Sequence, residues 1–211
     1  MILVGDIHGD FAFLKKVIRE NPNKTIIQVG DFGYWPFLSN TWHDLEIEGR
    51  VYFIEGNHDY LPDLVHLKNL TEVWKNAFYV PRSTVLELED TRIGFIGGAN
   101  SIDRKWRKKN SMQHGWFEEE EVTEKDVDKL LSRKPDIVIA HAAPVKVIER
   151  HFDPKVPVAF FGHLPGEWVD PSAINLQKVA DTGIPYYCGH MHDEVIDGNV
   201  RILGINEVIE I

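Results

Sequence analysis

Three short apolar runs in the first third of the chain each lead into a glycine that is followed by an acidic or amide side chain. A short run without polar alternation is typical of a strand that is buried on both faces. In an open α/β sheet, functional side chains gather at the carboxyl ends of such strands. The pattern therefore predicts an α/β fold with a polar site at one edge of a sheet. The runs are residues 1–4 before Gly5-Asp6, 25–29 before Gly30-Asp31, and 51–54 before Gly56-Asn57.

The second half of the chain adds strands of a different kind. Two hairpins are expected, one with strands 84–89 and 92–96 and one with strands 194–196 and 200–203 around Asp197-Gly198-Asn199. Apolar spacing predicts helices over 11–20 and 118–132. Strands over 136–140 and 185–188 lead into His141 and Gly189-His190. We expect two mixed sheets packed together with helices outside, in one domain over 1–211.

Composition excludes several classes of protein. The formal net charge of −10 argues against a broad nucleic-acid-binding surface. No apolar run approaches the roughly 20 residues that a membrane-spanning helix needs. The single cysteine, Cys188, excludes an internal disulfide framework and fits a reducing compartment. Its place at the end of an apolar run predicts buried packing. Together with a start that carries no basic region or cleavage site, this predicts a cytoplasmic location.

The polar residues near the predicted strand ends are of the types that bind metal ions. Seven donors of mixed oxygen and nitrogen character exceed what one ion takes, and they suit two ions that share a bridging carboxylate. Residues two apart on a strand point to the same side. Asp6 and His8 are therefore expected to converge while Ile7 turns away, and His190 and His192 to converge while Met191 turns away. His58 is left over, and a two-metal site beside a free histidine is typical of phosphate-ester hydrolysis. The donors are Asp6, His8, Asp31, Asn57, His141, His190 and His192.

These blocks, in this order from Asp6 to His192, resemble those of the calcineurin-like metallophosphoesterase superfamily. The resemblance implies a four-layer α/β/β/α sandwich with the metal site at the carboxyl ends of the strands. It implies a catalytic role for His58 near the leaving group, with Asp59 orienting the His58 ring and raising its pKa. It also implies a first ion on Asp6, His8, Asp31 and His192, and a second on Asp31, Asn57, His141 and His190, with Asp31 as the bridge.

The resemblance predicts a reaction as well as a site. Two dications roughly 3.5–4 Å apart would lower the pKa of a shared water enough to supply hydroxide, which attacks phosphorus in line. His58 would protonate the departing oxygen. Manganese, zinc and iron all fit the ligand mixture. Gly162-His163 imitates the last block but lacks a second histidine two residues later, so His163 is expected to be a loop residue and not a ligand.

Two segments are candidates for setting the substrate. The stretch 97–109 combines a glycine-rich turn with a basic run around Trp106, which would either clamp phosphate and stack a base or form a solvated loop. Arg104 and Arg107 are the expected substrate-binding residues, because a similar Gly-Gly-Ala-x-Ser-x-Asp-Arg stretch occurs in bacterial and phage members of the superfamily. The second segment, 145–184, would be a lid over the site or peripheral packing.

The sequence departs from one branch of the superfamily. Protein Ser/Thr phosphatases and dinucleoside tetraphosphatases continue after the second Gly-Asp to Asp-Arg-Gly and carry Gly-Asn-His-Glu. This chain has Phe32-Gly33-Tyr34 and ends the later block with Asp59, which resembles the compact bacterial and phage phosphodiesterases. We therefore expect a two-metal phosphodiesterase for small phosphodiesters, cyclic nucleotides among them. The alternatives are a metal-dependent nuclease on single strands, for which the run around Trp106 is the only support, and a non-catalytic scaffold with the same fold.

Overall fold

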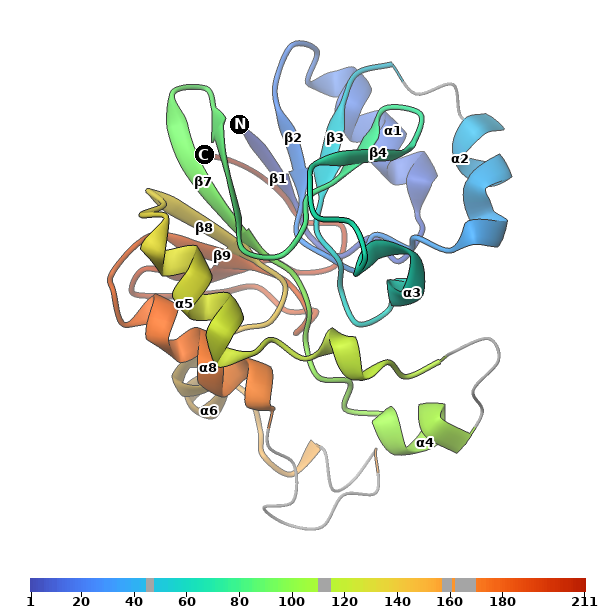
Figure 1. The fold of residues 1–211 in the computed structure, drawn as a ribbon. Coiled ribbons are helices and arrows are strands. Elements are labelled where there is room, and N and C mark those ends of the chain that lie inside the picture. Colours follow the sequence, from blue (N-terminus) through green and yellow to red (C-terminus); the bar gives the residue numbers. More distant parts are fainter. Residues whose placement is uncertain (45–47, 110–114, 157–160, 162–169) are drawn as a thin grey trace.

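Two six-stranded mixed sheets form the centre of this computed structural model, which describes residues 1–44, 48–109, 115–156, 161 and 170–211 (Figure 1). Their strand orders are β12-β1-β2-β3-β5-β4 and β10-β11-β9-β8-β7-β6. The strands of the first sheet are β1 (Ile2–Val4), β2 (Ile26–Gln28), β3 (Val51–Phe53), β4 (Thr71–Trp74), β5 (Ala77–Tyr79) and β12 (Val208–Glu210). Those of the second are β6 (Thr84–Leu88), β7 (Thr91–Ile96), β8 (Ile137–Ala140), β9 (Tyr186–Cys188), β10 (Val195–Asp197) and β11 (Val200–Ile202).

The two sheets share one design, in which parallel strands are flanked by antiparallel edges. In the first sheet β1, β2, β3 and β5 run parallel, while β12 and β4 pair antiparallel at the edges. In the second sheet β7, β8, β9 and β11 run parallel, while β6 and β10 form the antiparallel edges. The carboxyl ends of parallel strands lie along one edge of a sheet, so loops that follow neighbouring strands are brought together.

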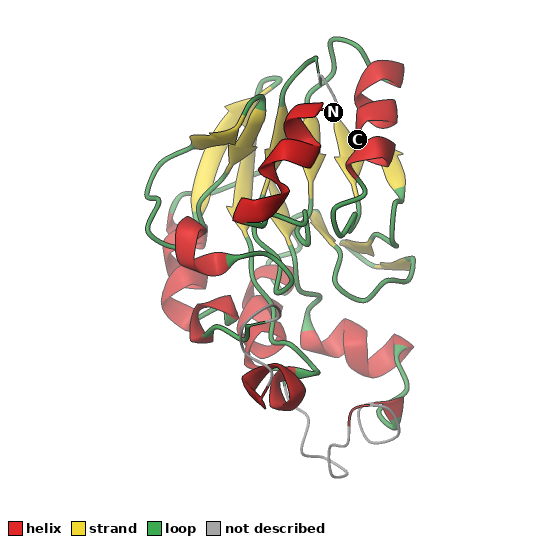
Figure 2. Cartoon of the chain, turned by 90° about the vertical axis from the view of Figure 1, so that its right-hand side faces the viewer, coloured by secondary structure: helices red, strands yellow, loops and turns green. Residues whose placement is uncertain are grey.

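Helices cover the outer face of each sheet, which confirms the expected four-layer α/β/β/α sandwich (Figures 1 and 2). Side chains of α1 and α2 pack on the first sheet, and side chains of α5, α6 and α8 pack on the second. The helices are α1 (Phe11–Glu20), α2 (Ser39–Asp44), α3 (Leu61–Leu64), α4 (Arg104–Lys109), α5 (Glu124–Ser132), α6 (Val145–His151) and α8 (Pro171–Ala180). Among the described residues, no helix is long and apolar enough to cross a membrane.

Strand periodicity explains why the strand runs are apolar throughout. Successive side chains of a strand point to opposite faces, so a strand between two layers needs apolar residues at every position. In β1, Ile2 and Val4 lie in the core under α1, while Leu3 lies in the core between the sheets. In β8, Val138 faces the helices of the second sheet and Ile139 faces the inter-sheet core. The fold thus contains three cores, one between each pair of neighbouring layers.

The first helix follows its sequence pattern closely. The side chain of Asp10 caps α1 by accepting a hydrogen bond from the Phe13 N–H at 3.0 Å. The buried positions of α1 are Phe11, Leu14, Val17 and Ile18. Their spacing places them on one face of the helix, toward the first sheet.

The predicted continuous helix over 118–132 is wrong, because the chain turns before the helix proper begins. A 3₁₀ turn spans Glu118–Glu120, and α5 begins only at Glu124. Thr123 caps α5 in a reciprocal capping box with Asp126, in which each side chain binds the other residue's backbone N–H. Glu120, the last residue of the turn, is fully buried.

Several other elements differ from expectation. The hairpin of β6 and β7 turns one residue earlier than predicted, through left-handed Glu89 and Asp90. The second predicted hairpin also forms, from β10 and β11, but Asp197 pairs with Val200 as part of β10 and is not in the turn. Within segment 145–184, α6 and α8 pack into the core of the second sheet, as the expectation of peripheral packing has it. Residues 157–160 and 162–169, which include His163, lie outside the described part of the chain. Cys188 is fully buried and free, as expected.

Candidate metal centre

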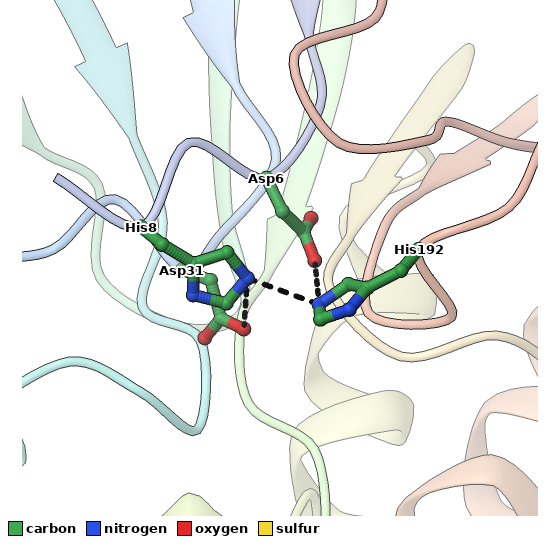
Figure 3. Close-up of side chains that lie close together, drawn as sticks. All are labelled: Asp6, His8, Asp31 and His192. Carbon is green, nitrogen blue, oxygen red and sulfur yellow. Dashed lines mark hydrogen bonds and ion pairs between the residues drawn. The ribbon is translucent and has the colours of Figure 1, made fainter. Parts of the chain in front are cut away.

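The seven predicted ligands all lie in loops that begin at the carboxyl ends of strands. Three ligand-bearing loops belong to the first sheet and follow β1, β2 and β3, and two belong to the second sheet and follow β8 and β9. Loops of both sheets therefore meet at one place in the fold. Figure 3 shows the side chains of Asp6, His8, Asp31 and His192 pointing toward one another from these loops.

A first group of ligand atoms comes from Asp6, His8, Asp31 and His192, and these atoms lie within 4.8 Å of one another. The Nε2 atoms of His8 and His192 are 3.0 Å apart. His192 Nε2 lies 3.4 Å from Asp6 Oδ2, and His8 Nε2 lies 3.8 Å from Asp31 Oδ2. Both histidines are exposed while both carboxylates are fully buried, so the group has a buried acidic floor and a side that solvent reaches.

A second group comes from Asp31, His141 and His190 and lies deeper in the protein. His141 Nε2 is 3.4 Å from Asp31 Oδ1 and 3.2 Å from the side-chain oxygen of Asn57. The rings of His141 and His190 meet edge to face with centroids 5.1 Å apart. Asp31 belongs to both groups, with Oδ2 toward His8 and Oδ1 toward His141. This is the placement that a bridging carboxylate needs.

Unsatisfied carboxylate oxygens show that the donor set fits cations. Asp6 Oδ1 and Asp31 Oδ2 are buried and have no hydrogen-bond partner among the residues that the structure describes. A buried carboxylate oxygen without a partner carries a large desolvation cost, which a bound cation removes. Mixed carboxylate, amide and imidazole donors suit divalent transition metals. The residues present therefore fit the expected ions.

Protonation of His141 compensates part of this negative charge. Burial alone would lower the pKa of His141, but the carboxylates of Asp31 and Asp6 raise it to about 10. Burial likewise opposes ionisation of Asp31, yet His141 and other nearby histidines hold the pKa of Asp31 well below its ordinary value. The buried carboxylates thus favour positive charge close to them.

The backbone of the site is unusual at four of its ligands. His8, Asp31, His190 and His192 all have left-handed backbone, with φ of 44°, 53°, 67° and 59°. Residues other than glycine adopt this region rarely and at a cost, and such residues cluster at functional sites. The expected reason for convergence, alternation along a strand, is wrong, because the ligands lie beyond the strand ends and His190 and His192 fall into different groups.

Two glycines let the ligand loops approach each other. A Cβ on Gly189 would lie 1.9 Å from Asp6 Oδ1, and a Cβ on Gly56 would lie 2.0 Å from Asp31 Oδ1. Real side chains never approach so closely, so any other residue would displace the carboxylate. Glycine before the ligand is therefore a requirement of close approach at these two positions.

His58 lies beside the first group, and Arg107 contacts it. Its ring meets that of His8 edge to face at 5.1 Å, and one terminal nitrogen of Arg107 is 2.7 Å from Nδ1 and 2.8 Å from Nε2. Burial, reinforced by Arg107 and against the effect of Asp31, lowers the pKa of His58 to about 4. Asp59, which was expected to raise this pKa, is not among the main influences on it.

Asp59 ties two loops together and does not contact His58. Its carboxylate is buried, and burial and Asp31 raise its pKa, while backbone N–H donors lower it. Asp59 was expected to orient the His58 ring, but among the described residues both of its oxygens accept hydrogen bonds from backbone N–H groups. These donors are Phe32 at 3.3 Å, Gly33 at 2.8 Å, Tyr34 at 2.7 Å and Gly56 at 2.8 Å.

The two arginines predicted to bind substrate have different surroundings. Arg107 is only 3% exposed, and it donates to the Asn57 carbonyl at 2.6 Å and pairs with Asp103 at 2.8 Å. Arg104 donates to the side-chain oxygen of Asn100 at 3.2 Å. The structure therefore brings Arg107 to the site, where it contacts His58, and directs Arg104 toward Asn100.

Sequence reasoning missed three residues that surround the site. The Trp35 indole N–H donates to the His58 carbonyl at 3.0 Å. Ser101 Oγ accepts a hydrogen bond from the Asn57 side chain at 3.1 Å, and Glu120 binds Ser101. Ser101 lies within the stretch singled out for substrate binding, but no sequence signal distinguishes Glu120 from the three glutamates next to it.

The chain was compared with family models, solved structures and curated proteins. The family model described as "Calcineurin-like phosphoesterase" matches residues 1–194. Among solved structures, the chain is similar to the calcineurin-like phosphoesterase YfkN from Bacillus subtilis, with 14% identity and a TM-score of 0.42 over 97% of this chain and 81% of that one. A search of curated proteins finds no match.

Proposed function

This chain belongs to the calcineurin-like phosphoesterase family, a family of metal-dependent phosphoric ester hydrolases, and we propose that it is a two-metal phosphodiesterase that acts on small phosphodiesters such as cyclic nucleotides. The observation that carries this proposal is the pair of ligand groups that share Asp31. One carboxylate between two sets of converging donors is the arrangement that two-metal ester hydrolysis requires.

Each residue of the site has a proposed role. Asp6, His8, Asp31 and His192 would hold one divalent ion, and Asp31, Asn57, His141 and His190 would hold the second. Such ions lower the pKa of a water and neutralise charge on phosphoryl oxygens. His58 would contact the departing oxygen of the substrate, because it borders the exposed side of the first group.

A row of aromatic side chains beside His58 favours substrates with an aryl or nucleobase group. The rings of Trp35 and Tyr60 are 5.4 Å apart, and those of Tyr60 and Phe117 are 5.8 Å apart. Phe37, 70% exposed, extends the row past Trp35 at 5.7 Å. Stacking of a base on an aromatic side chain contributes about 1–3 kcal/mol, which would favour aryl and nucleoside esters over alkyl esters.

A nuclease acting on single strands is the second candidate, and α4 is the feature that favours it. Trp106 is 53% exposed on this helix, and the Lys108 ammonium lies 3.8 Å from the centre of the Trp116 ring. The net charge of −10 opposes binding along an extended polyanion. Binding of single strands that weakens steeply with salt would identify the nuclease.

The test is a substrate panel on metal-stripped protein that is reconstituted separately with manganese, zinc and ferrous iron. The panel holds bis-p-nitrophenyl phosphate, p-nitrophenyl phosphate, a dialkyl phosphate, cyclic nucleotides and single-stranded DNA. We expect the aryl diester and cyclic nucleotides to be hydrolysed faster than the monoester and the dialkyl ester. Hydrolysis of no ester with any metal would refute the proposal.

The role of His58 has its own test. His58→Ala is expected to lower kcat by about 10²–10⁴-fold with metal content unchanged. His66, which is exposed, supplies the matched control, and His66→Ala is expected to match the wild type. Loss of metal from His58→Ala would mean that His58 is a ligand and that the proposed role is wrong.

A further inference from the structure

A buried chain of hydrogen bonds leads from Glu120 through Ser101 to Asn57. The Glu120 carboxyl accepts the Ser101 backbone N–H at 2.8 Å and the Ser101 hydroxyl at 2.9 Å. Ser101 Oγ accepts the Asn57 side-chain N–H at 3.1 Å. Glu120 and Ser101 are both fully buried, so water does not compete for these groups.

The direction of these hydrogen bonds determines which end of the Asn57 amide faces the metal centre. An ionised Glu120 carboxylate only accepts hydrogen bonds, so in this form the hydroxyl proton of Ser101 points to Glu120 and only lone pairs remain for Asn57. Burial raises the pKa of Glu120 to about 7, so this form prevails above neutral pH. Asn57 must therefore turn its NH₂ toward Ser101. Its carbonyl oxygen then lies 3.2 Å from His141 Nε2, among the ligands of the second group. The opposite orientation would point the NH₂, which cannot bind a cation, at the metal centre.

We propose that Glu120 and Ser101 are positioning residues that hold the Asn57 oxygen toward the second ion. The proposal rests on the proposed function, because it assumes that Asn57 is a ligand. Neither residue touches substrate or metal, and each acts only through the Asn57 amide. Residues that orient a metal ligand in this way typically change metal affinity by about 10–100-fold when they are replaced.

Two substitutions interrupt this series of hydrogen bonds at different points. Ser101→Ala removes the acceptor for the Asn57 NH₂, so the amide is free to turn over. Glu120→Gln replaces one carboxylate oxygen by an NH₂. If this NH₂ donates to the Ser101 hydroxyl, the Ser101 proton turns toward Asn57 and favours the opposite orientation of its amide. Ser101→Thr keeps the hydroxyl and is the conservative variant that should restore binding.

The chain offers a matched control at Ser83. Like Ser101 it is fully buried, and its hydroxyl donates to the Asp126 carbonyl at 2.7 Å, away from the ligands. Ser83→Ala therefore deletes one buried hydroxyl and one hydrogen bond without breaking the chain to Asn57. It reports what a purely structural loss does to metal binding.

The experiment is calorimetric titration of the full-length, metal-stripped protein with manganese, with Tm and circular dichroism measured for every variant. We expect Ser101→Ala and Glu120→Gln to weaken one of two binding events about 10–100-fold and to leave the other within about threefold. Ser101→Thr is expected to bind nearly as the wild type does, and Ser83→Ala to bind as the wild type does.

Three outcomes would overturn the proposal. If Ser101→Ala and Glu120→Gln fold and bind both ions with wild-type affinity, the positioning role is refuted while the two-metal function stands. If Ser83→Ala weakens binding as much as Ser101→Ala does, the effect is general destabilisation. If the wild type binds fewer than two ions, the proposed function fails before any variant is compared.

Discussion

Replacing Asp59 by asparagine separates a structural role of this carboxylate from a catalytic one. The carboxylate accepts four backbone N–H groups from the loops after β2 and β3, and these loops carry Asp31 and Asn57. A structural role predicts a loss of stability. A role through His58, as adjacency in sequence implies, predicts a change in catalysis with stability unchanged.

The magnitude follows from the hydrogen bonds. Asparagine keeps one acceptor oxygen, which serves the Gly33 and Tyr34 N–H groups at 2.8 and 2.7 Å. Its NH₂ then faces the N–H groups of Phe32 and Gly56, which are left buried without an acceptor. Each unsatisfied group costs about 1–3 kcal/mol, so Asp59→Asn should destabilise the protein by roughly 2–6 kcal/mol. For a protein of this size, a destabilisation of about 2 kcal/mol, the lower end of this range, corresponds to a fall in Tm of at least about 4 °C.

The assay is urea unfolding of the metal-stripped protein, with calorimetric Tm as a second measure. Asp44, exposed on α2, supplies the matched control, and Asp44→Asn should change stability by no more than about 0.5 kcal/mol. If Asp59→Asn has wild-type stability but a displaced pH profile of kcat, the structural reasoning is refuted and Asp59 acts through His58.

Three further changes have definite expected results. Gly189→Ala places a Cβ 1.9 Å from Asp6 Oδ1 and should weaken metal binding. Gly204→Ala meets only ordinary contacts and should leave metal binding unchanged. Equal metal affinities of the two variants in a calorimetric titration would contradict this steric argument. Burial raises the pKa of Asp170 to about 6, so its ionisation opposes folding. The free energy of unfolding of the wild type should therefore fall by up to about 3 kcal/mol relative to that of Asp170→Asn as the pH rises from about 4 through 6. If the free energies of unfolding of the two proteins in urea depend on pH in the same way, this effect is excluded. Asp31→Asn should weaken both ion-binding events because Asp31 belongs to both ligand groups, and a calorimetric titration in which only one event changes would exclude the bridge.

The elements that sequence reasoning predicted are those with the strongest hydrophobic pattern. Strands such as β1 and β8 lie between two layers, and their apolar runs leave little alternative. Of the three missed strands, β4 (Thr71–Trp74) and β12 (Val208–Glu210) lie at sheet edges and are partly exposed, so polar residues interrupt them, whereas β5 is a short apolar strand between β3 and β4. Edge strands carry half the burial signal of central ones, which is why their sequences do not distinguish them from loops.

The candidate site was predictable in its residue types but not in its contacts. Side chains that bind metal are chemically distinctive, so their identity and order are visible in sequence. Which neighbour holds which side chain is decided by the backbone. Asp59 follows His58 directly yet accepts hydrogen bonds from the loop after β2, while Arg107, 49 residues away, contacts the His58 ring. Left-handed conformations at ligands such as His8 and His190 give no pattern that a periodicity argument detects.

The contribution of both sheets to one site has a consequence for folding. Asp6 and His190 are 184 residues apart in the chain, yet the Asp6 carboxylate accepts the His190 backbone N–H at 2.9 Å. A partly folded chain with only one sheet formed presents half a ligand set, which binds ions weakly. Ions that bind only when both sheets are docked would stabilise that docking by mass action. Bound ions would therefore act as a link between the two sheets.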